Sequence, residues 1–486
     1  MKIALVASEC TPFAKTGGLA DVIGALPKYL AKLGVDVKVF IPKYDIIDEK
    51  KHSLRFMSEI NGINVRVAGN PRRVYLHTAN IPGSEVLVYF IDCREYFFRG
   101  KIYTDDRDED ERWILFNKAV IEALQRLQWA PDVIHCNDWQ TGLLPLLVKD
   151  NYGWDRLFEE TSFLYSIHNI AYQGRFPPET VTKGELRKDY YYPGGPLEYY
   201  NTVCMMKAGI VFSDIISTVS ETYAREILTP HFGAGMQDIL RTREHDLFGV
   251  LNGIDTEEWN PETDCYLPYH YSRDDLSGKL KNKQFLLTKT SLPFDERTPL
   301  IGIVSRLVEQ KGFDLVAEAI DRLMAVNAQW IILGTGREQY EQLFADIASK
   351  FPDRCKAHIG FDNELAHLIE AGADMFLMPS HYEPCGLNQM YSLRYGTVPI
   401  VRKTGGLADT VRDWNEEPET GTGFSFVEAN GTALVRTIQR AIDLFHQPDI
   451  WRKIQRNGMA QDFSWEHSAQ KYIELYHKAI HKHRKL

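Results

Sequence analysis

The heptapeptide KTGGLAD occurs twice in the chain, at residues 15–21 and, letter for letter, at residues 403–409. Each copy follows a short apolar run and precedes the apolar periodicity of a helix. A glycine pair at a helix start leaves backbone N–H groups unpaired at the positive end of the helix dipole, which suits an anion. The repeat therefore predicts two similar α/β domains that meet over one charged, polyhydroxylated ligand.

Strand-like and helix-like segments alternate over most of the length, which is typical of parallel sheets with helices on both faces. A β-rich insertion is expected at about 62–92, with turns at Asn61-Gly62 and Pro82-Gly83. The expected strands are 2–7, 35–41, 132–137, 162–168, 215–220 and 247–252 in the first half, and 299–306, 330–334, 356–360, 374–379 and 397–401 in the second. The predicted fold class is α/β, with two similar domains built on parallel sheets.

The composition excludes several classes of protein. A net charge of −10 argues against a nucleic-acid partner or an anionic membrane surface. The seven cysteines include no CxxC pair, so neither a disulfide framework nor a zinc ribbon is indicated. The first apolar run is too short for a signal peptide, and no run approaches the ~20 residues of a membrane span. We expect a cytoplasmic protein.

The acidic run from Asp105 to Glu111 could be taken for a metal site. It is interrupted by Arg107, has no glycine at a calcium-loop position, and directly precedes an expected helix. Acidic residues at a helix start complement the helix dipole, so a solvated loop is the favoured interpretation. No metal site is expected.

Two cations follow the strand expected at the start of the second domain. Arg306 and Lys311 lie five residues apart in a strand-to-helix loop, where both can converge above the carboxyl edge of a sheet. Arginine offers a planar fork and lysine a point charge, which together suit a pyrophosphate leaving group. The alternative is a pair of unrelated surface cations.

The segment HYEPCGL at 381–387 follows another expected strand. Glu383 would lie at a sheet edge, beside the N–H groups of Cys385, Gly386 and Leu387 at the start of a helix. A carboxylate and a cluster of N–H donors could hold the hydroxyls of a hexose. An ordinary helix N-cap region explains the same residues.

Polar and aromatic residues also end two strands of the first half, in HCNDWQ at 135–140 and SIHNIAYQG at 166–174. Side chains at strand carboxyl ends are typical of ligand sites in such sheets, although single capping residues are common there. An aromatic tract around Tyr190 to Tyr200 could stack on sugar rings, and packing explains it equally well.

Taken together, KTGGLADV, HCNDWQ, HN-AYQG, VLNGID, SRL-x3-KG, EPCGL and the second KTGGLAD stand in the order found in one family. The chain resembles the bacterial glycogen synthase and plant starch synthase family over essentially its whole length. These are retaining glucosyltransferases of the GT-B class, in which two Rossmann-like domains face each other across a cleft.

The resemblance implies an enzyme that transfers glucose from ADP-glucose to the non-reducing end of an α-1,4-glucan. It implies an N-terminal starch synthase catalytic domain on the acceptor side at 1–253, and a C-terminal glycosyltransferase domain on the nucleotide-sugar side at 254–460. A closing helix at 461–486 is expected to pack back on the first domain. No cofactor is implied.

The resemblance also implies roles for individual residues. Lys15, Gly17 and Gly18 would face the pyrophosphate and glucose of the donor, and Asp21 would fix their loop. The diphosphate would be neutralised by Arg306 and Lys311. Glucose hydroxyls would be held by Glu383 and by the N–H groups of Cys385, Gly386 and Leu387. The residues beside the anomeric carbon would be Asp138 and His168, with Asn169 nearby.

Two positions depart from the pattern. Wider GT-B enzymes carry a second glutamate where this chain has Tyr391, and Asn388 stands where threonine is expected. Competing functions are the same fold with UDP-glucose or another acceptor, an epimerase or a pyridoxal-dependent phosphorylase, and a catalytically silent glucan-binding protein.

Overall fold

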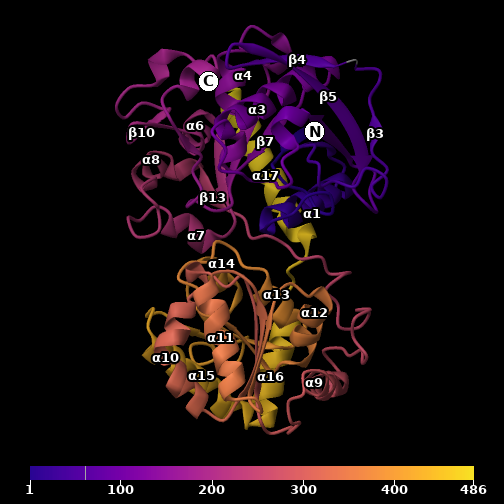
Figure 1. Ribbon diagram of the computed structural model, residues 1–486, viewed down its shortest axis with the longest axis vertical. Coiled ribbons are helices and arrows are strands. Elements are labelled where there is room, and N and C mark those ends of the chain that lie inside the picture. The colour runs from indigo at the N-terminus through magenta and orange to yellow at the C-terminus, as the bar shows by residue number, and fades with distance from the viewer. Residues whose placement is uncertain (61, 486) are drawn as a thin grey trace. The chain divides into compact units, whose positions relative to one another are not determined.

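The computed structural model describes residues 1–60 and 62–485, and the chain divides into two compact units (Figure 1). The first unit contains Met1–Val219, Ala224–Gly253 and the segment that begins at Trp465. The second contains Ser220–Tyr223 and Ile254–Ser464. The predicted turn at Asn61-Gly62 lies partly outside the described residues, because Asn61 is not among them.

The first unit is built on a sheet whose strands run in the order β13-β12-β8-β7-β1-β2-β6-β5-β3, with β4 paired to β5. The strands are β1 (Lys2–Val6), β2 (Asp36–Pro42), β3 (Arg55–Phe56), β4 (Ile63–Val67), β5 (Asn70–Asn80), β6 (Leu87–Asp92), β7 (Val133–Asn137), β8 (Ser162–Ile167), β12 (Ile215–Thr218) and β13 (Leu247–Gly249). All pair in parallel except β3, β4 and β5, which pair antiparallel. The expected β-rich insertion is therefore an antiparallel extension of a parallel sheet.

The helices of this unit are α1 (Gly18–Lys32), α2 (Arg94–Phe97), α3 (Glu109–Arg126), α4 (Leu144–Lys149), α5 (Thr180–Lys183), α6 (Met205–Phe212), α8 (Gln237–Thr242) and α17 (Trp465–His483). The short helix α7 (Glu221–Glu226) begins in the residues assigned to the second unit and ends in those assigned to the first. A small sheet is formed by β9 (Arg175–Phe176), β10 (Glu198–Tyr199) and β11 (Thr202–Cys204). From the far end of the sequence, α17 packs against α1, β7, β8 and β12. In α1, the face with Leu19, Ile23, Leu26 and Leu30 is buried, and Gly34 follows its end with φ +82°.

The second unit has an all-parallel sheet in the order β16-β15-β14-β17-β18-β19. Its strands are β14 (Leu300–Val304), β15 (Gln329–Gly334), β16 (Cys355–Ile359), β17 (Met375–Met378), β18 (Val398–Arg402) and β19 (Phe424–Phe426). Its helices are α9 (Ser277–Lys289), α10 (Phe313–Ala325), α11 (Glu338–Lys350), α12 (Asn363–Gly372), α13 (Asn388–Arg394), α14 (Gly405–Thr410), α15 (Gly431–Phe445) and α16 (Pro448–Met459). The sequence did not predict β19, which has only three residues.

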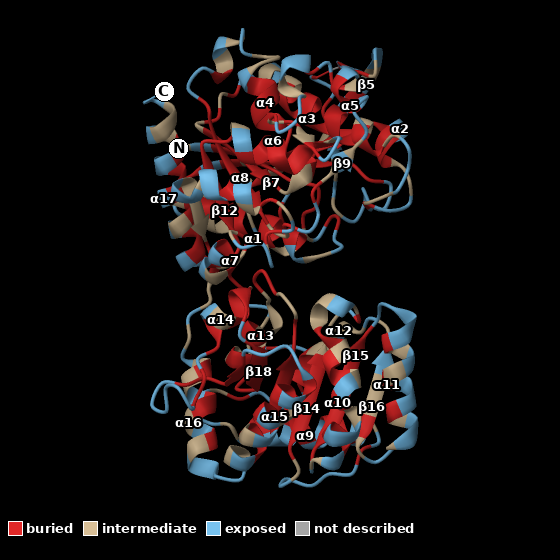
Figure 2. Cartoon of the chain, turned by 90° about the vertical axis from the view of Figure 1, so that its left-hand side faces the viewer, coloured by how far each residue is buried: buried red, intermediate tan, exposed pale blue. Residues whose placement is uncertain are grey.

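Alternate residues of the second sheet pack on opposite faces, and Figure 2 shows its buried strands between helices with exposed outer faces. Trp330 and Ile332 join a core with α10, α11, α15 and α16. Ile331 and Leu333 join a second core with α9 and α12. The doubly wound α/β fold is thus confirmed.

The acidic run behaves differently from the expected solvated loop. Glu109 and Asp110 are buried in the first turn of α3. Glu109 accepts hydrogen bonds from Arg112 and from the Trp113 indole, and Asp110 pairs with Lys183 at 3.0 Å. The prediction was wrong for these two residues because paired carboxylates can be buried at a helix start.

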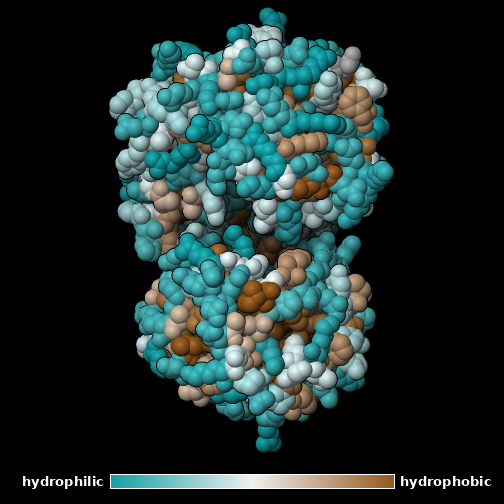
Figure 3. All heavy atoms as spheres, viewed as in Figure 1, coloured by the Kyte–Doolittle hydropathy of each residue, from teal (hydrophilic) through white to brown (hydrophobic). Residues whose placement is uncertain are grey.

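On the face shown in Figure 3, hydrophilic residues cover most of the surface of each unit. Among the described helices, none is both long enough and apolar enough to span a bilayer.

Candidate active site

In the first unit, the carboxyl ends of β7 and β8 bring Asp138, His168 and Asn169 together. The backbone N–H of His168 donates to Asp138 Oδ1 at 2.7 Å, and His168 Nε2 lies 2.9 Å from Asn137 Oδ1. Asn169 Oδ1 accepts from the N–H of Ala171 at 3.0 Å, which turns the chain after β8. Sequence reasoning missed Asn137, which orients the imidazole.

Asp138 has a strained backbone, with φ +57° and ψ −178°, in a region that is almost exclusive to glycine. The strain is held in place because its N–H donates to Ser166 O at 2.9 Å and its carbonyl accepts from the N–H of Thr141. Burial raises the pKa of the Asp138 carboxyl to about 7, although the N–H groups of His168 and Asn169 act in the opposite direction. A strained, perturbed carboxyl at a sheet edge is typical of a functional site.

His168 is a neutral imidazole at pH 7, since burial lowers its pKa to about 4. Behind it, His135 lies 2.9 Å from the Tyr476 hydroxyl of α17 and 2.6 Å from Ser166 Oγ. Burial lowers the pKa of His135 to about 3. The long C-terminal helix thus supports β7 and β8 directly behind the site residues.

The first glycine turn joins β1 to α1 and carries Lys15. Lys15 Nζ donates to Asp21 Oδ1 at 2.6 Å, and the lysine side chain is 53% exposed. The sequence predicted that the N–H groups of this turn would be free to bind an anion. In the structure, two of them are not free. Those of Thr16 and Gly17 donate to the buried carboxylate of Glu9. That prediction was wrong for these two groups because the chain supplies its own anion.

No internal packing explains the glycines of this turn. Among the residues that the structure describes, a Cβ built on Gly17 or Gly18 would have no neighbour within 4 Å, and Gly17 has an ordinary extended φ of −155°. The open space in front of both Cα atoms leaves room for a ligand to approach the backbone closely.

In the second unit, the loop after β14 carries Arg306 and Lys311. Arg306 is exposed, and its guanidinium has no partner among the residues that the structure describes. Lys311 Nζ instead donates to Glu383 Oε2 at 2.5 Å, and Ser380 Oγ donates to the same oxygen at 3.0 Å. Of the two cations expected to converge, Arg306 is therefore free among the described residues, and Lys311 belongs to a partly buried ion pair.

Next to Glu383, the chain enters α13 through Cys385, Gly386 and Leu387. Gly386 has φ +73°, and a Cβ there would come within 2.4 Å of Gln389 Oε1. Gln389 Nε2 donates to Cys385 O and Gly386 O, both at 3.0 Å. These bonds turn the carbonyls toward α13 and give the loop a fixed shape.

The second glycine turn packs against this same loop. A Cβ on Gly405 would lie 2.0 Å from Glu383 O, and one on Gly406 would lie 2.0 Å from Cys385 O. The N–H of Gly406 donates to Glu383 O at 3.0 Å. The prediction of an anion site at this turn is therefore wrong. The N–H of Gly406 is bonded to Glu383 O, and the Glu383 loop fills the space in front of both glycines.

Comparisons with known proteins agree with this geometry. Residues 2–242 match the starch synthase catalytic domain, and residues 286–458 match the glycosyl transferases group 1 domain. The glycogen synthase of Thermosipho africanus is 44% identical over all of both chains. That of Desulforudis audaxviator is 45% identical over 99% of this chain and 97% of its own. This chain belongs to the glycogen synthase and starch synthase family.

Solved structures support the same assignment. The catalytic domain of starch synthase IV from Arabidopsis thaliana, bound to ADP and acarbose, is 33% identical, with a TM-score of 0.91 over 99% of each chain. Sucrose-phosphate synthase from Thermosynechococcus elongatus is 18% identical, with a TM-score of 0.61 over 98% of each chain, and shares the fold. The GT-B fold predicted from the sequence is confirmed.

The two positions that depart from the family pattern have structural roles. Tyr391 stacks on Trp259 at 3.9 Å, and Trp259 stacks on His367 at 3.8 Å, so the tyrosine anchors the segment after residue 254 to α13 and α12. Asn388 Nδ2 donates to Val304 O at 2.6 Å. Asn388 thereby ties the start of α13 to the strand end that precedes Arg306.

Phe361 is a further candidate that sequence reasoning missed. It follows β16, at the same carboxyl edge as the Arg306 loop, and its residue surface is 89% exposed. An aromatic ring at this edge can stack on a nucleotide base or a sugar. A large apolar side chain directly after a strand and its glycine was the signal in the sequence.

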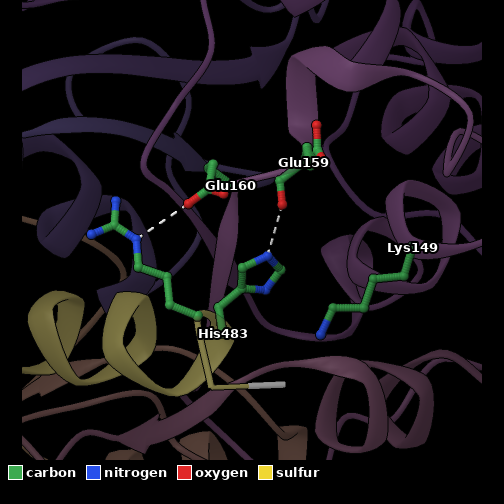
Figure 4. Close-up of a pocket in the computed structure, with 5 residues that line it drawn as sticks. Lys149, Glu159, Glu160 and His483 are labelled. Atoms are coloured by element: carbon green, nitrogen blue, oxygen red, sulfur yellow. Dashed lines mark hydrogen bonds and ion pairs between the residues drawn. The ribbon is translucent and has the colours of Figure 1, made fainter.

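A hollow in the first unit lies at the other edge of the sheet and holds none of these residues (Figure 4). Its charged groups pair among themselves or with neighbours. Arg484 Nε donates to Glu160 Oε2 at 3.2 Å, His483 Nε2 lies 3.0 Å from Glu159 O, and Lys149 pairs with Asp214 at 3.0 Å. Because Glu160 lies two residues before the amino end of β8, this hollow is not part of the candidate active site.

Proposed function

We propose that this protein transfers glucose from ADP-glucose to the non-reducing end of an α-1,4-glucan, with retention of anomeric configuration, in the cytoplasm. The observation that carries the proposal is the full-length identity of 44% to glycogen synthases. The relative solved with ADP and acarbose supports a nucleotide and a glucan-like ligand as the two substrates. The residues that the family motifs mark lie at the carboxyl edges of the two parallel sheets, where such folds bind ligands.

The second domain, residues 254–460, would hold the donor. Arg306 offers a free guanidinium for the diphosphate, and Lys311 adds a second positive charge beside Glu383. The glucose hydroxyls would bind Glu383 and the N–H groups of Cys385, Gly386 and Leu387. We assign Phe361 to the base, since its exposed ring stands at the same edge.

The first domain, residues 1–253, would bind the acceptor and close the donor site, and the helix in 461–486 belongs with it. Lys15, Gly17 and Gly18 would approach the pyrophosphate and glucose, and Asp21 holds Lys15 in position. As a carboxylate, Asp138 would stabilise positive charge at the anomeric carbon, beside His168 and Asn169.

In the reaction, the acceptor hydroxyl oxygen bonds to the anomeric carbon on the face from which the diphosphate departs. The bond from that carbon to the diphosphate oxygen breaks, and the hydroxyl proton passes to the departing oxygen. No protein side chain forms a bond to the sugar. Cationic stabilisation of the leaving group would lower most of the barrier, at about 3–4 kcal/mol for one well-placed contact.

The test is a transfer assay with purified protein, glycogen and radiolabelled ADP-glucose or UDP-glucose. We expect incorporation into glycogen from ADP-glucose, at a rate well above that from UDP-glucose, and no loss of activity with EDTA. Preference for UDP-glucose would favour the alternative donor. No incorporation from either would favour a silent glucan-binding protein.

Arg306→Ala tests the donor side. Because its guanidinium has no partner among the described residues, the variant should fold normally and lose about 10²-fold in turnover. A matched control is Arg452→Ala on α16, an exposed arginine with only a 3.9 Å contact to Asp449, which should keep full activity. Equal turnover in Arg306→Ala and the control would contradict the assigned role.

A further inference from the structure

The carboxylate of Glu9 is buried where β1 meets the first glycine turn, and the residue is only 3% exposed. Its two oxygens accept from four donors. Oε2 accepts from the N–H groups of Thr16 and of Gly17, the latter at 3.2 Å. Oε1 accepts from Thr16 Oγ1 at 2.9 Å and from the Tyr103 hydroxyl at 2.5 Å. A buried charge is costly unless it is hydrogen-bonded, and this one is fully satisfied.

The network continues from Glu9 into the body of the first unit. The Tyr103 hydroxyl lies 2.9 Å from Ser8 Oγ, and the Tyr44 hydroxyl donates to Ser8 O at 2.8 Å. Tyr44 follows β2, and Tyr103 precedes α3. Glu9 therefore fastens the turn to a network anchored by three separate segments of the fold.

The turn that Glu9 holds is not itself part of the core. Thr16 and Gly18 are exposed, and no atom of the described residues lies within 4 Å of a Cβ built on Gly17 or Gly18. An exposed turn of this kind would be mobile without a tie, since few contacts restrain it. A buried carboxylate with four hydrogen bonds thus holds an exposed segment in place.

We propose that Glu9 is the positioning residue of the donor-binding turn: its carboxylate occupies the N–H groups of Thr16 and Gly17 and fixes Lys15 and the open glycine face toward the donor. This inference rests on the proposed function. In consequence, the donor meets this turn through Lys15, the glycine Cα atoms and the first turn of α1, and not through the N–H groups that an anion would ordinarily take.

Glu9 also acts on the neighbouring carboxyl at a distance. Its negative charge contributes to the raised pKa of Asp138, after the larger effect of burial. Removing the charge without removing the side chain should lower the Asp138 pKa. The acid side of the pH profile for kcat/KM should then move to lower pH, which a purely structural role would not cause.

The experiment compares Glu9→Ala and Glu9→Gln by steady-state kinetics with ADP-glucose and glycogen. With the turn untied, Glu9→Ala should raise the KM for ADP-glucose by about 10-fold or more, and leave the KM for glycogen within about 2-fold. Glu9→Gln keeps an acceptor oxygen of the same reach, so it should recover part of the donor KM and show the shifted pH profile. Tyr103→Phe, which removes one of four donors, should give a smaller rise.

The matched control is Glu416→Ala. Glu416 is an exposed carboxylate that pairs with Lys403 of the second heptapeptide at 2.7 Å, so its loss should leave the donor KM unchanged. An active wild type with an unchanged donor KM in Glu9→Ala would overturn the inference and leave the proposed function standing. If Glu9→Ala does not fold, an unchanged KM in both Glu9→Gln and Tyr103→Phe would overturn it. A wild type that transfers nothing from ADP-glucose would refute the proposed function. In that case, the affinity for ADP of the wild type and of Glu9→Ala, measured by calorimetry, would test whether Glu9 positions the turn.

Discussion

The two copies of KTGGLAD have the same seven residues and opposite surroundings. In the first, the glycines face open space and the helix begins at Gly18. In the second, both glycines are buried against the Glu383 loop and the helix begins one position earlier, at Gly405, with φ +45°. The first copy leaves its glycines open, and the second supports a neighbouring loop.

The charged residues of the two copies differ in the same way. Lys15 pairs with Asp21 of its own copy, whereas Lys403 pairs with Glu416 at 2.7 Å. Asp409, the counterpart of Asp21, accepts from the N–H and hydroxyl of Thr222, in the short segment that belongs to the second unit. Identical sequence at a strand-to-helix junction therefore gives a similar local fold, while the residues packed on it decide its function.

Alanine at the second glycine of each copy should give the largest difference in stability. Gly406→Ala places a Cβ on backbone atoms of Cys385, which cannot move without displacing the Glu383 loop. We expect a loss of about 3 kcal/mol in the unfolding free energy, measured as a lowered transition in calorimetry. Gly18→Ala should change it by less than about 1 kcal/mol, since alanine suits a helix start. Equal losses of stability in the two variants would contradict the difference in packing between the two copies.

The lysines of the two copies should separate activity from structure. Lys15→Ala should lower kcat/KM for ADP-glucose by about 10²-fold, because a charge at the leaving group is lost. Lys403→Ala removes only an exposed ion pair, worth about 0–1 kcal/mol, and should stay within about 2-fold of the wild type. Similar losses in both variants would mean that the second copy also touches the substrate.

The Asp138 carboxyl should give the effect that depends most strongly on pH. Its pKa is about 7 in the folded protein and lies near its ordinary value of 3.8 in the unfolded chain, so the unfolded state loses the proton first as the pH rises. Wild-type stability should therefore fall between about pH 4 and 7 relative to Asp138→Asn, which cannot titrate there. Thermal unfolding of both proteins at pH 5 and pH 8 measures this, and a constant difference would contradict it.

Ionised Asp138 should also be needed for transfer. The kcat/KM of the wild type should then fall as the pH drops through about 7, while Asp138→Asn should be slow at every pH. A profile that is flat from pH 8 to pH 5.5 would remove the carboxylate from the reaction.

The fold and the location of the candidate site could be predicted from the sequence. Parallel strands end at one edge, so polar residues after β7, β8, β14 and β17 had to lie at sheet edges. The pairing of residues at those edges could not be predicted. Lys311 meets Glu383 only because β14 and β17 are neighbours in the sheet, and no local pattern encodes that order.

The role of the second heptapeptide was missed for the same reason. Its glycines touch the Glu383 loop because β18 lies next to β17. Glu9 was missed because its bonds to Thr16 and Gly17 lie within an irregular turn, where no periodicity marks a buried carboxylate. The raised pKa of Asp138 likewise comes from burial, which the sequence does not show.

Hydrogen–deuterium exchange of the two identical heptapeptides, with and without ADP, tests the comparison most directly. Peptides that contain residues 15–21 should gain protection when ADP binds, because ADP then covers the N–H groups of this turn that Glu9 does not hold, such as that of Gly18. Peptides that contain residues 403–409 should be protected before ADP is added and change little, because Gly406 already donates to Glu383 O. Protection gained at 403–409 and not at 15–21 would contradict the account.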